Sequence, residues 1–296
     1  MAPVLALVGP TATGKTGVAL EVARARGDVE IVAADAFTVY VGMDVGTAKP
    51  SLADRVAVPH HLVDVLDPGT EATVAWFQDA ARTAIEEVHA RGRLPLLVGG
   101  SGLYFRAVVD DLRFPPTDPE VRAAIEARHR DAPEAAHEAL HALDPDAAAR
   151  IDPTNLRRTV RALEVIELTG ERFSSFARAW DRYEPIYPDL EVLGLDLESS
   201  ELRQRIEARA RTMVAEGLVE EARRLQALPR PLSTTARQAI GYAEALAVLA
   251  GRLAEHELAP AIARRTMRYA RRQRSWFRAD PRVLWTRPEE AVAAWT

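Results

Sequence analysis

The first sixteen residues contain the pattern that most restricts the fold of this chain. An apolar stretch, Val4–Val8, runs directly into Gly9-Pro10-Thr11-Ala12-Thr13-Gly14-Lys15-Thr16, and a helical pattern follows to about Arg26. Between a strand and a helix, such a run forms a loop whose backbone N–H groups surround a phosphate, with Lys15 neutralising it and the Thr16 hydroxyl near Mg²⁺. The pattern predicts a di- or triphosphate site and leaves open which molecule carries the phosphates.

Lysine is almost absent from the rest of the chain. Lys15 and Lys49 are the only two lysines among 38 basic residues. A compact ammonium fits among wrapped backbone amides where a planar guanidinium does not, which explains why Lys15 is retained. Lys49 ends the run Asp44-Val45-Gly46-Thr47-Ala48-Lys49 before Pro50. Its retention favours a role near the phosphate or in holding this loop, although the segment also fits an ordinary turn.

Apolar strands alternate with helical patterns over much of the chain. Strands are expected at Val4–Val8, 29–33, 94–98 and Leu190–Leu195, with helices at 16–26, 73–91, 199–216, 235–250 and 255–277. This alternation is typical of an α/β fold with a parallel sheet, in which ligands bind at the carboxyl ends of the strands. Because the chain contains a phosphate loop, we expect this fold to take the form of a P-loop NTPase-like core flanked by helices.

Residues 114–188 differ in character from the rest. They begin with the linker-like run Phe114-Pro115-Pro116-Thr117-Asp118-Pro119 and continue as an alanine-rich, helical sequence with no strong strand. The simplest interpretation is an all-α insertion domain at 114–188. The catalytic core would then consist of 1–113 and 189–296.

The composition is that of a soluble globular protein, with 48% hydrophobic and 27% charged residues. No apolar run approaches the ~18 residues of a membrane span, no basic segment of a signal peptide is visible, and the lack of cysteine excludes disulfides. A cytoplasmic protein is expected. The net charge of −5 argues mildly against nucleic acid, but eight arginines and one acid between 264 and 282 leave room for a local basic surface.

Few carboxylates are placed to act beside the phosphate. Common P-loop hydrolases carry an Asp at the end of a core strand, whereas the strand at 94–98 ends in glycines. Asp35, after the strand at 29–33, is therefore the carboxylate expected over the phosphate, unless it only stabilises a turn. Ser101, in the glycine turn after 94–98, has helix capping as its simple explanation. The spacing of His60 and His61 matches no standard zinc motif and favours a structural role.

Two arginine clusters stand out. The helix at 255–277 carries an apolar stripe, Leu258, Ile262, Tyr269 and Trp276, and a basic stripe, Arg264, Arg268, Arg271 and Arg272. A solvated face is the usual meaning of such a stripe, but the scarcity of acidic partners equally favours contact with RNA or phosphate. The second cluster consists of Arg157, Arg158 and Arg161.

Taken together, these segments resemble the tRNA dimethylallyltransferase family, also called isopentenyl-tRNA transferases. The resemblance is collinear over nearly the whole chain, and Gly46-Thr47-Ala48-Lys49-Pro50 is far more specific than the phosphate loop. The matching segments are 9–16, 35–40 continued by 42–50, 59–64 (Pro-His-His-Leu-Val-Asp), 98–104 (Val-Gly-Gly-Ser-Gly-Leu-Tyr), 157–165, 238–242 (Gln-Ala-Ile-Gly-Tyr) and 271–278.

The resemblance implies transfer of a dimethylallyl group from dimethylallyl diphosphate to N6 of adenosine-37, directly 3′ of the anticodon in tRNA. The loop would then hold a leaving diphosphate, so a hydrolytic Asp is not needed. An exocyclic adenine amine is a weak nucleophile that requires a base and alignment, and the leaving diphosphate requires cations. The target base must also be turned out of the anticodon loop. Mg²⁺ is the implied cofactor.

Family roles carry over to individual positions. Asp35 is implied as general base, Ser101 takes the place of a family threonine beside the substrate or Asp35, and Arg209 is implied at the diphosphate. Diphosphate binding is expected from Gly9, Thr11, Ala12, Thr13, Gly14, Lys15, Thr16 and Lys49, with Thr16 also at the metal. Contacts to tRNA are expected from Asp35, Ala36, Phe37, Thr38, Ser101, Arg157, Arg158, Arg161, Gln238, Gly241, Tyr242, Arg264, Arg268, Arg271 and Arg272.

The chain departs from the family at a few positions, and two other functions remain open. Ala36 and Thr38 stand where the family usually has Ser and Gln, which leaves a tRNA contact by Thr38 undecided. A small-molecule or nucleoside kinase would use the same loop with ATP and would not need the arginine surfaces. A non-catalytic RNA-binding protein would not need intact Lys15, Thr16 and Asp35. A monomer is expected.

Overall fold

The computed structural model describes residues 3–177, 180 and 182–296, and the chain forms two compact units. Unit 1 comprises Met1–Val109 and Pro185–Thr296, and unit 2 comprises Asp110–Glu184; the sequence placed the insertion at 114–188. Residues after Glu184 join the core because the Ile186 N–H donates to the Val109 carbonyl (2.8 Å) and the Tyr187 side chain is buried there. Residues 1–2, 178–179 and 181 of the predicted domains lie outside the described part.

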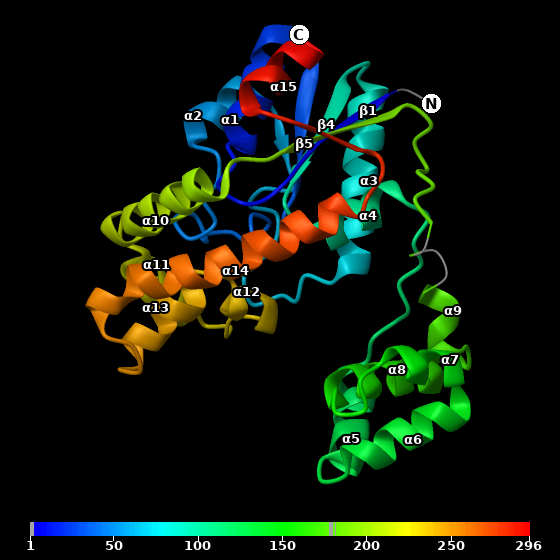
Figure 1. Ribbon diagram of the computed structural model, residues 1–296. Helices are drawn as coiled ribbons and strands as arrows, with labels where there is room; N and C mark the ends of the chain where they lie inside the picture. The colour runs from blue at the N-terminus through cyan, green and yellow to red at the C-terminus, as the bar shows by residue number, and fades with distance from the viewer. Residues whose placement is uncertain (1–2, 178–179, 181) are drawn as a thin grey trace. The chain divides into compact units, whose positions relative to one another are not determined.

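Unit 1 is built on a six-stranded sheet in which every neighbouring pair is parallel (Figure 1). The strand order is β3-β2-β4-β1-β5-β6. The strands are β1 (Val4–Val8), β2 (Val29–Ala34), β3 (His60–His61), β4 (Leu94–Gly99), β5 (Leu190–Leu195) and β6 (Val283–Thr286). This confirms the predicted parallel α/β sheet, and β3 and β6 are strands that the apolar patterns did not indicate.

Helices cover both faces of the sheet, which is why its strands are apolar on both sides. On one face, β1, β2, β4 and β5 bury Leu and Val side chains against α1 (Lys15–Arg26) and α15 (Pro288–Trp295). The other face packs against α3 (Val74–Ala90) and α4 (Gly102–Val109) in the larger core. Thr73 caps α3 by accepting the Trp76 N–H, which sets its start one residue after the predicted one.

A group of helices after β5 completes unit 1. They are α10 (Ser199–Ala215), α11 (Leu218–Gln226), α12 (Thr234–Gln238), α13 (Tyr242–Leu249), the 3₁₀ turn η2 (Glu255–Glu257) and α14 (Leu258–Arg278), and the short α2 (Leu52–Ala57) follows the Lys49 loop. The single helix predicted at 235–250 is wrong, because Gly241 has φ 98° and separates α12 from α13. In α14, Leu258, Ile262 and Phe277 are buried, whereas Trp276 of the predicted apolar stripe is 42% exposed.

Unit 2 consists of five helices with no strand among its described residues: α5 (Pro119–His129), α6 (Pro133–Leu143), α7 (Pro145–Arg150), α8 (Leu156–Thr169) and α9 (Phe173–Ala177). The prolines that punctuate the sequence begin α5, α6 and α7, where a missing N–H costs nothing. Ile125, Leu140, Val160 and Leu163 form a separate core. Across the described residues of both units, no helix is long and apolar enough to cross a membrane.

Candidate active site

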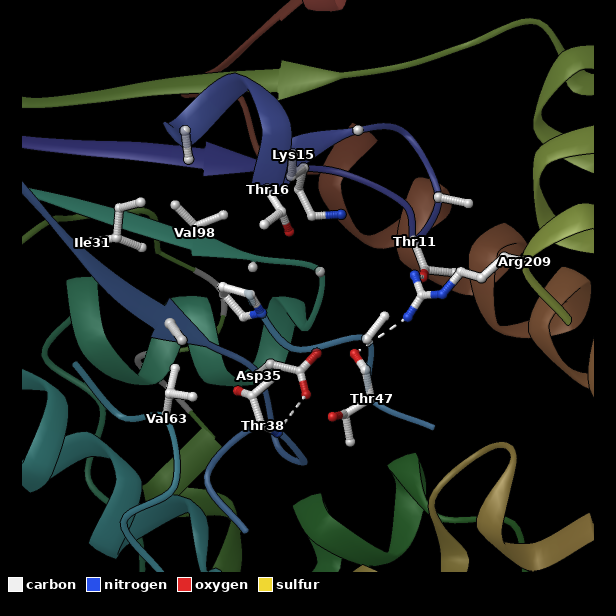
Figure 2. Close-up of a pocket in the computed structure, with 18 of the residues that line it drawn as sticks. Thr11, Lys15, Thr16, Ile31, Asp35, Thr38, Thr47, Val63, Val98 and Arg209 are labelled. Atoms are coloured by element: carbon white, nitrogen blue, oxygen red, sulfur yellow. Dashed lines mark hydrogen bonds between the residues drawn. The ribbon is translucent and has the colours of Figure 1, made fainter. Parts of the chain in front are cut away.

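A cavity of about 430 Å³ lies at the carboxyl ends of β1, β2 and β4. Figure 2 shows Lys15 and Thr16 at one wall, Arg209 at another, and Asp35 and Thr38 opposite the phosphate loop. Asp35 is the only acidic side chain among the described residues that line it, against the cations Lys15, Arg205 and Arg209. The cavity is therefore suited to an anion that carries several charges.

The phosphate loop has the backbone shape that anion binding requires. Ala12 (φ 66°) and Gly14 (φ 94°) adopt left-handed conformations that turn successive N–H groups towards one side. Thr13 is fully buried and its hydroxyl donates to the Pro10 carbonyl, so this residue can offer only its backbone. Thr11, Ala12, Gly14, Lys15 and Thr16 all line the cavity.

Lys15 supplies the positive charge of the phosphate loop, and its surroundings lower its affinity for the proton. The ammonium donates to the carbonyls of Gly9 (2.9 Å) and Pro10 (2.7 Å). Burial and the nearby Arg209 guanidinium lower the pKa of Lys15 to about 7, although Asp35 acts in the opposite direction. A bound phosphate would supply the negative charge that favours the protonated form.

Arg209 comes from α10 and bridges two loops of the site. One Nη donates to the Thr11 hydroxyl (3.1 Å) and the other to the Thr47 carbonyl (3.3 Å). Its Nε is buried and has no partner within the described residues, and burial holds the pKa of Arg209 below its ordinary value. Arg209 therefore lies beside the phosphate loop. Arg205, one turn earlier, also lines the cavity.

Asp35 follows β2 and is held in a defined orientation. Its Oδ1 accepts the N–H groups of Phe37 (2.8 Å) and Thr38 (3.4 Å), so the turn that was its simple explanation is present. Its Oδ2 makes no hydrogen bond within the described residues, which leaves it free for a ligand. The Thr38 hydroxyl is buried without a partner in the same part of the chain and lines the same cavity.

Ser101 and the two histidines have mainly structural contacts. Ser101 stands at the start of α4, where its hydroxyl accepts the Tyr104 N–H at 3.5 Å, and it does not line the cavity. His61 contacts Glu30 at 2.7 Å, as its expected structural role requires. His60 does line the cavity; its Nδ1 lies 2.7 Å from the Val58 carbonyl, and burial lowers the pKa of its ring.

A smaller pocket of about 70 Å³ shares Thr11, Asp35 and Arg209 with the main cavity. The rest of its lining is mostly apolar and comes from distant parts of the chain: Phe37, Ile206, Ala210, Met213, Ala239, Ile240 and Ile262. A small apolar group attached to a phosphate could therefore lie between the carboxylate and the guanidinium. Sequence periodicity marks these residues only as core positions.

Lys49 does not contact the phosphate loop, and its predicted place among the diphosphate ligands is corrected. Its side chain is 3% exposed, and the ammonium donates to the Tyr40 carbonyl (2.6 Å), Asp44 (2.8 Å) and Asp64 (2.5 Å). These three acceptors use its three N–H donors. Lys49 therefore holds the loop, which was the other role considered for it.

The segment 238–242 also differs from its predicted role in binding tRNA. Tyr242 is 0% exposed, and its hydroxyl contacts Glu221 and the Gly46 N–H (3.2 Å). Gly241 is buried, while Gln238 is exposed and its carbonyl accepts from Arg265 at 2.6 Å. The exposed side chain of Gln238 is accessible to a partner, whereas the buried side chain of Tyr242 is not.

The predicted arginine clusters contain both exposed members and one member held by hydrogen bonds, Arg161. Arg157 and Arg158 are exposed on α8, whereas Arg161 donates to Glu164 (2.7 Å) and to the carbonyls of Pro115 and Pro116 (both 2.8 Å). On α14, Arg264, Arg268, Arg271 and Arg272 are exposed. A groove between α10 and α14 is lined by Arg203, Arg211, His256, Arg264, Arg268 and Arg271, with Glu207 its one acid among the described residues.

Sequence reasoning missed Gln273 as a member of the site. From α14, its amide accepts the Thr11 N–H (2.9 Å) and donates to the Gly100 carbonyl (2.7 Å), which ties the phosphate loop to the turn after β4. It is 5% exposed and lines the cavity. The only available signal was an uncharged amide inside a run of arginines.

Two family models match the chain. The model described as IPP transferase covers residues 38–280, and the one described as isopentenyl transferase covers residues 2–59. The chain therefore belongs to the IPP transferase family. The second match includes the phosphate loop and Asp35, and the first includes Arg209 and Gln273.

Individual relatives agree with this assignment. A tRNA dimethylallyltransferase of Kineococcus radiotolerans is 52% identical over 96% of this chain and 90% of its own length, and one of Bifidobacterium longum is 46% identical over 95% and 85%. Among solved structures, a tRNA isopentenylpyrophosphate transferase of Bacillus halodurans is 38% identical with a TM-score of 0.72, covering 99% of this chain and 94% of that one. This IPP transferase shares its P-loop NTPase-like fold with that structure.

Proposed function

We propose that this protein transfers a dimethylallyl group from dimethylallyl diphosphate to N6 of adenosine-37 in tRNA, releasing diphosphate. The observation that carries the proposal is one cavity that joins a phosphate loop to a single carboxylate, Asp35. The tRNA dimethylallyltransferases to which the chain is similar support tRNA as acceptor. The absence of a second acid among the described lining residues supports a diphosphate that leaves rather than one that is hydrolysed.

In the proposed reaction, the N6 nitrogen forms a bond to C1 of the dimethylallyl group while the bond from C1 to the diphosphate oxygen breaks. The electron pair of that bond leaves with diphosphate, and the N6 proton passes to Asp35. The two backbone N–H groups on Oδ1 hold the carboxylate in place, and Oδ2 is the oxygen available for the proton. The Thr38 hydroxyl would accept or donate a hydrogen bond at the adenine edge.

The departing diphosphate would meet the cations of the opposite wall. The loop N–H groups and Lys15 bind one phosphate, and Arg209 reaches the other from α10. These groups stabilise negative charge that grows as the C1–O bond breaks, so they lower the barrier rather than only tightening binding. Because they are held by Gln273 and by the Thr47 carbonyl before substrate arrives, little reorganisation is needed.

Mg²⁺ fits the donors present. The Thr16 hydroxyl lines the cavity beside Lys15, and the described residues contain no cluster of three or more His, Asp and Glu side chains able to hold a metal alone. Mg²⁺ usually binds through one or two protein oxygens together with substrate phosphates, so Thr16 and the diphosphate would hold it. The ion would add positive charge at the leaving group.

The apolar side pocket suits the five-carbon group. Phe37, Ile206, Met213, Ile240 and Ile262 surround a space between Asp35 and Arg209. Their side chains would orient C1 and keep water from an electrophile that water could otherwise capture.

The groove between α10 and α14 supports the tRNA partner. Five arginines against Glu207 give it a strong positive charge on a protein whose net charge is −5. Arginines without acidic partners can neutralise the phosphates of a nucleic acid, and the counterions that this releases favour binding. Arg203 and Arg211 extend the basic surface beyond the stripe that the sequence indicated.

The comparisons favour tRNA prenylation over the kinase alternative, since the curated relatives at 46–52% identity are tRNA dimethylallyltransferases. A cytoplasmic monomer remains our proposal, as adenosine-37 is reached in the tRNA pool of the cytoplasm. ATP is not expected to support the reaction.

The direct test supplies radiolabelled dimethylallyl diphosphate, Mg²⁺ and tRNA with adenosine next to the anticodon. Label is expected in the RNA, and Asp35→Asn is expected to retain diphosphate binding while losing about 10²- to 10⁴-fold in rate. The matched control is Asp67→Asn, because Asp67 also accepts a turn N–H (Gly69, 2.8 Å) but does not line the cavity. Transfer of the γ-phosphate of ATP to a small acceptor, with no label in RNA, would refute the proposal.

A further inference from the structure

Two buried polar side chains form hydrogen bonds to the loop that carries Thr47. We propose that Glu221 of α11 and Tyr242 of α13 form a clamp whose function is to position Arg209 through the backbone of Thr47. The Glu221–Tyr242 clamp acts on the diphosphate end of the site, so this inference rests on the function proposed above. It replaces a contact with tRNA as the role of Tyr242.

Glu221 binds the loop through its backbone. The carboxylate accepts hydrogen bonds from the N–H groups of Asp44 (3.2 Å) and Val45 (3.1 Å) and from the Tyr242 hydroxyl. The hydroxyl oxygen in turn accepts the Gly46 N–H at 3.2 Å. Three consecutive backbone N–H groups of the loop therefore end on the clamp.

The close fit of Gly46 against Tyr242 shows that the loop position is specified. A Cβ added to Gly46 would lie 2.3 Å from Cε2 of the Tyr242 ring, so only glycine allows this approach. Burial and then the hydrogen bond to Glu221 raise the pKa of Tyr242, which keeps its hydroxyl a proton donor at all physiological pH. The Tyr242 ring sets how closely the loop approaches α13, and the hydroxyl sets which backbone N–H group of the loop lies against it.

The next residue of the loop passes this position on to the site. The Thr47 carbonyl accepts from Arg209 (3.3 Å), and the other Nη of Arg209 donates to Thr11 of the phosphate loop (3.1 Å). Thr47 lines both the main cavity and the apolar pocket. A displaced loop would remove one of the two contacts that orient the guanidinium.

Packing alone does not explain these residues. Glu221 is 3% exposed, and within the described residues it forms hydrogen bonds to the loop and to Tyr242 and no ion pair. A buried carboxylate is costly compared with an apolar side chain of similar size, and it persists where it fixes a geometry. Here that geometry is the loop facing Arg209.

The test uses the full chain and inorganic diphosphate as the probe, so that binding is measured apart from transfer. Tyr242→Phe keeps the ring and removes the hydroxyl that binds Glu221 and the Gly46 N–H, and of these two hydrogen bonds the neutral one from Gly46 is adjacent to Thr47. We expect the loss of that hydrogen bond to lower diphosphate affinity about fivefold. The KM for dimethylallyl diphosphate should rise with it, whereas affinity for tRNA should stay unchanged. The control Tyr40→Phe removes an equally buried hydroxyl that accepts the Ala72 N–H at 3.2 Å, and should leave diphosphate affinity at the wild-type value.

A double-mutant cycle separates positioning from general loosening. In an Arg209→Ala background, Tyr242→Phe should have no further effect on diphosphate affinity, because the group that it positions is gone. Glu221→Gln, which keeps the shape of the side chain, provides the same comparison if Tyr242→Phe unfolds. Additive effects of the two substitutions, or a loss of tRNA affinity with unchanged diphosphate affinity, would overturn the clamp. A wild-type protein that binds diphosphate but labels no RNA would instead refute the proposed function.

Discussion

Gln273 offers the sharpest quantitative test of how the site is held together. Its single amide satisfies the Thr11 N–H of the phosphate loop and the Gly100 carbonyl after β4, at 2.9 and 2.7 Å. Gln273→Leu preserves the volume approximately and leaves both backbone groups without their partner. A buried unsatisfied group costs about 1–3 kcal/mol. The costs of the two unsatisfied groups add. Because Thr11 faces a cavity that admits water, we expect the lower end of that sum, a loss of about 2 kcal/mol in the free energy of unfolding.

The substitution should lower thermal stability and also weaken substrate binding. A loss of about 2 kcal/mol lowers Tm by roughly 4–8 °C in a domain of this size. Gln273→Glu retains an acceptor for Thr11 but sets a buried carboxylate against the Gly100 carbonyl, so it should cost at least as much as Gln273→Leu. Both should raise the KM for dimethylallyl diphosphate, because the loop loses its support on the α14 side.

The assay is thermal unfolding together with steady-state kinetics at varied dimethylallyl diphosphate. Gln78→Leu is the matched control, since Gln78 is also buried and donates to a backbone carbonyl (Ala107, 2.7 Å) outside the cavity. It should lower Tm and leave KM unchanged. If Gln273→Leu shifts Tm by less than about 1 °C, or raises KM no more than Gln78→Leu does, the reasoning is wrong.

Two further predictions concern the lysines. Since the pKa of Lys15 is about 7, its cationic fraction falls as pH rises, and the diphosphate affinity of wild type relative to Lys15→Gln should decrease by up to tenfold per pH unit above 7; a constant ratio from pH 6.5 to 9 would contradict this. Lys49→Gln should lower the free energy of unfolding by about 2 kcal/mol at pH 7, measured in urea. Burial alone would raise the pKa of Asp64, but hydrogen bonds from Lys49 and Arg55 outweigh it and lower the pKa, so this contribution should disappear as pH falls below the ordinary value of 3.8.

Local patterns predicted the parts of the fold that local physics controls. The strands Val4–Val8 and Leu190–Leu195 and the phosphate loop were expected where they occur, because continuous apolar runs and a glycine turn depend on neighbouring residues. The short strand β3 and the break at Gly241 were not, since a two-residue strand and a φ of 98° depend on what lies opposite them. Gly46 shows the same dependence, as its need for a missing Cβ comes from Tyr242, 196 residues away.

The sequence by itself determined the P-loop pattern between a strand and a helix, the α/β class and, through collinear motifs, the family. Only the tertiary structure decided which charged and polar side chains face the ligand. Lys15 and Lys49 look alike in the sequence, yet one lines the cavity and the other has all three donors on loop acceptors. Arg209 and Gln273 reach the same loop from separate helices. A motif specifies backbone shape over a few residues, whereas the direction and partners of a long side chain are set by packing between distant segments.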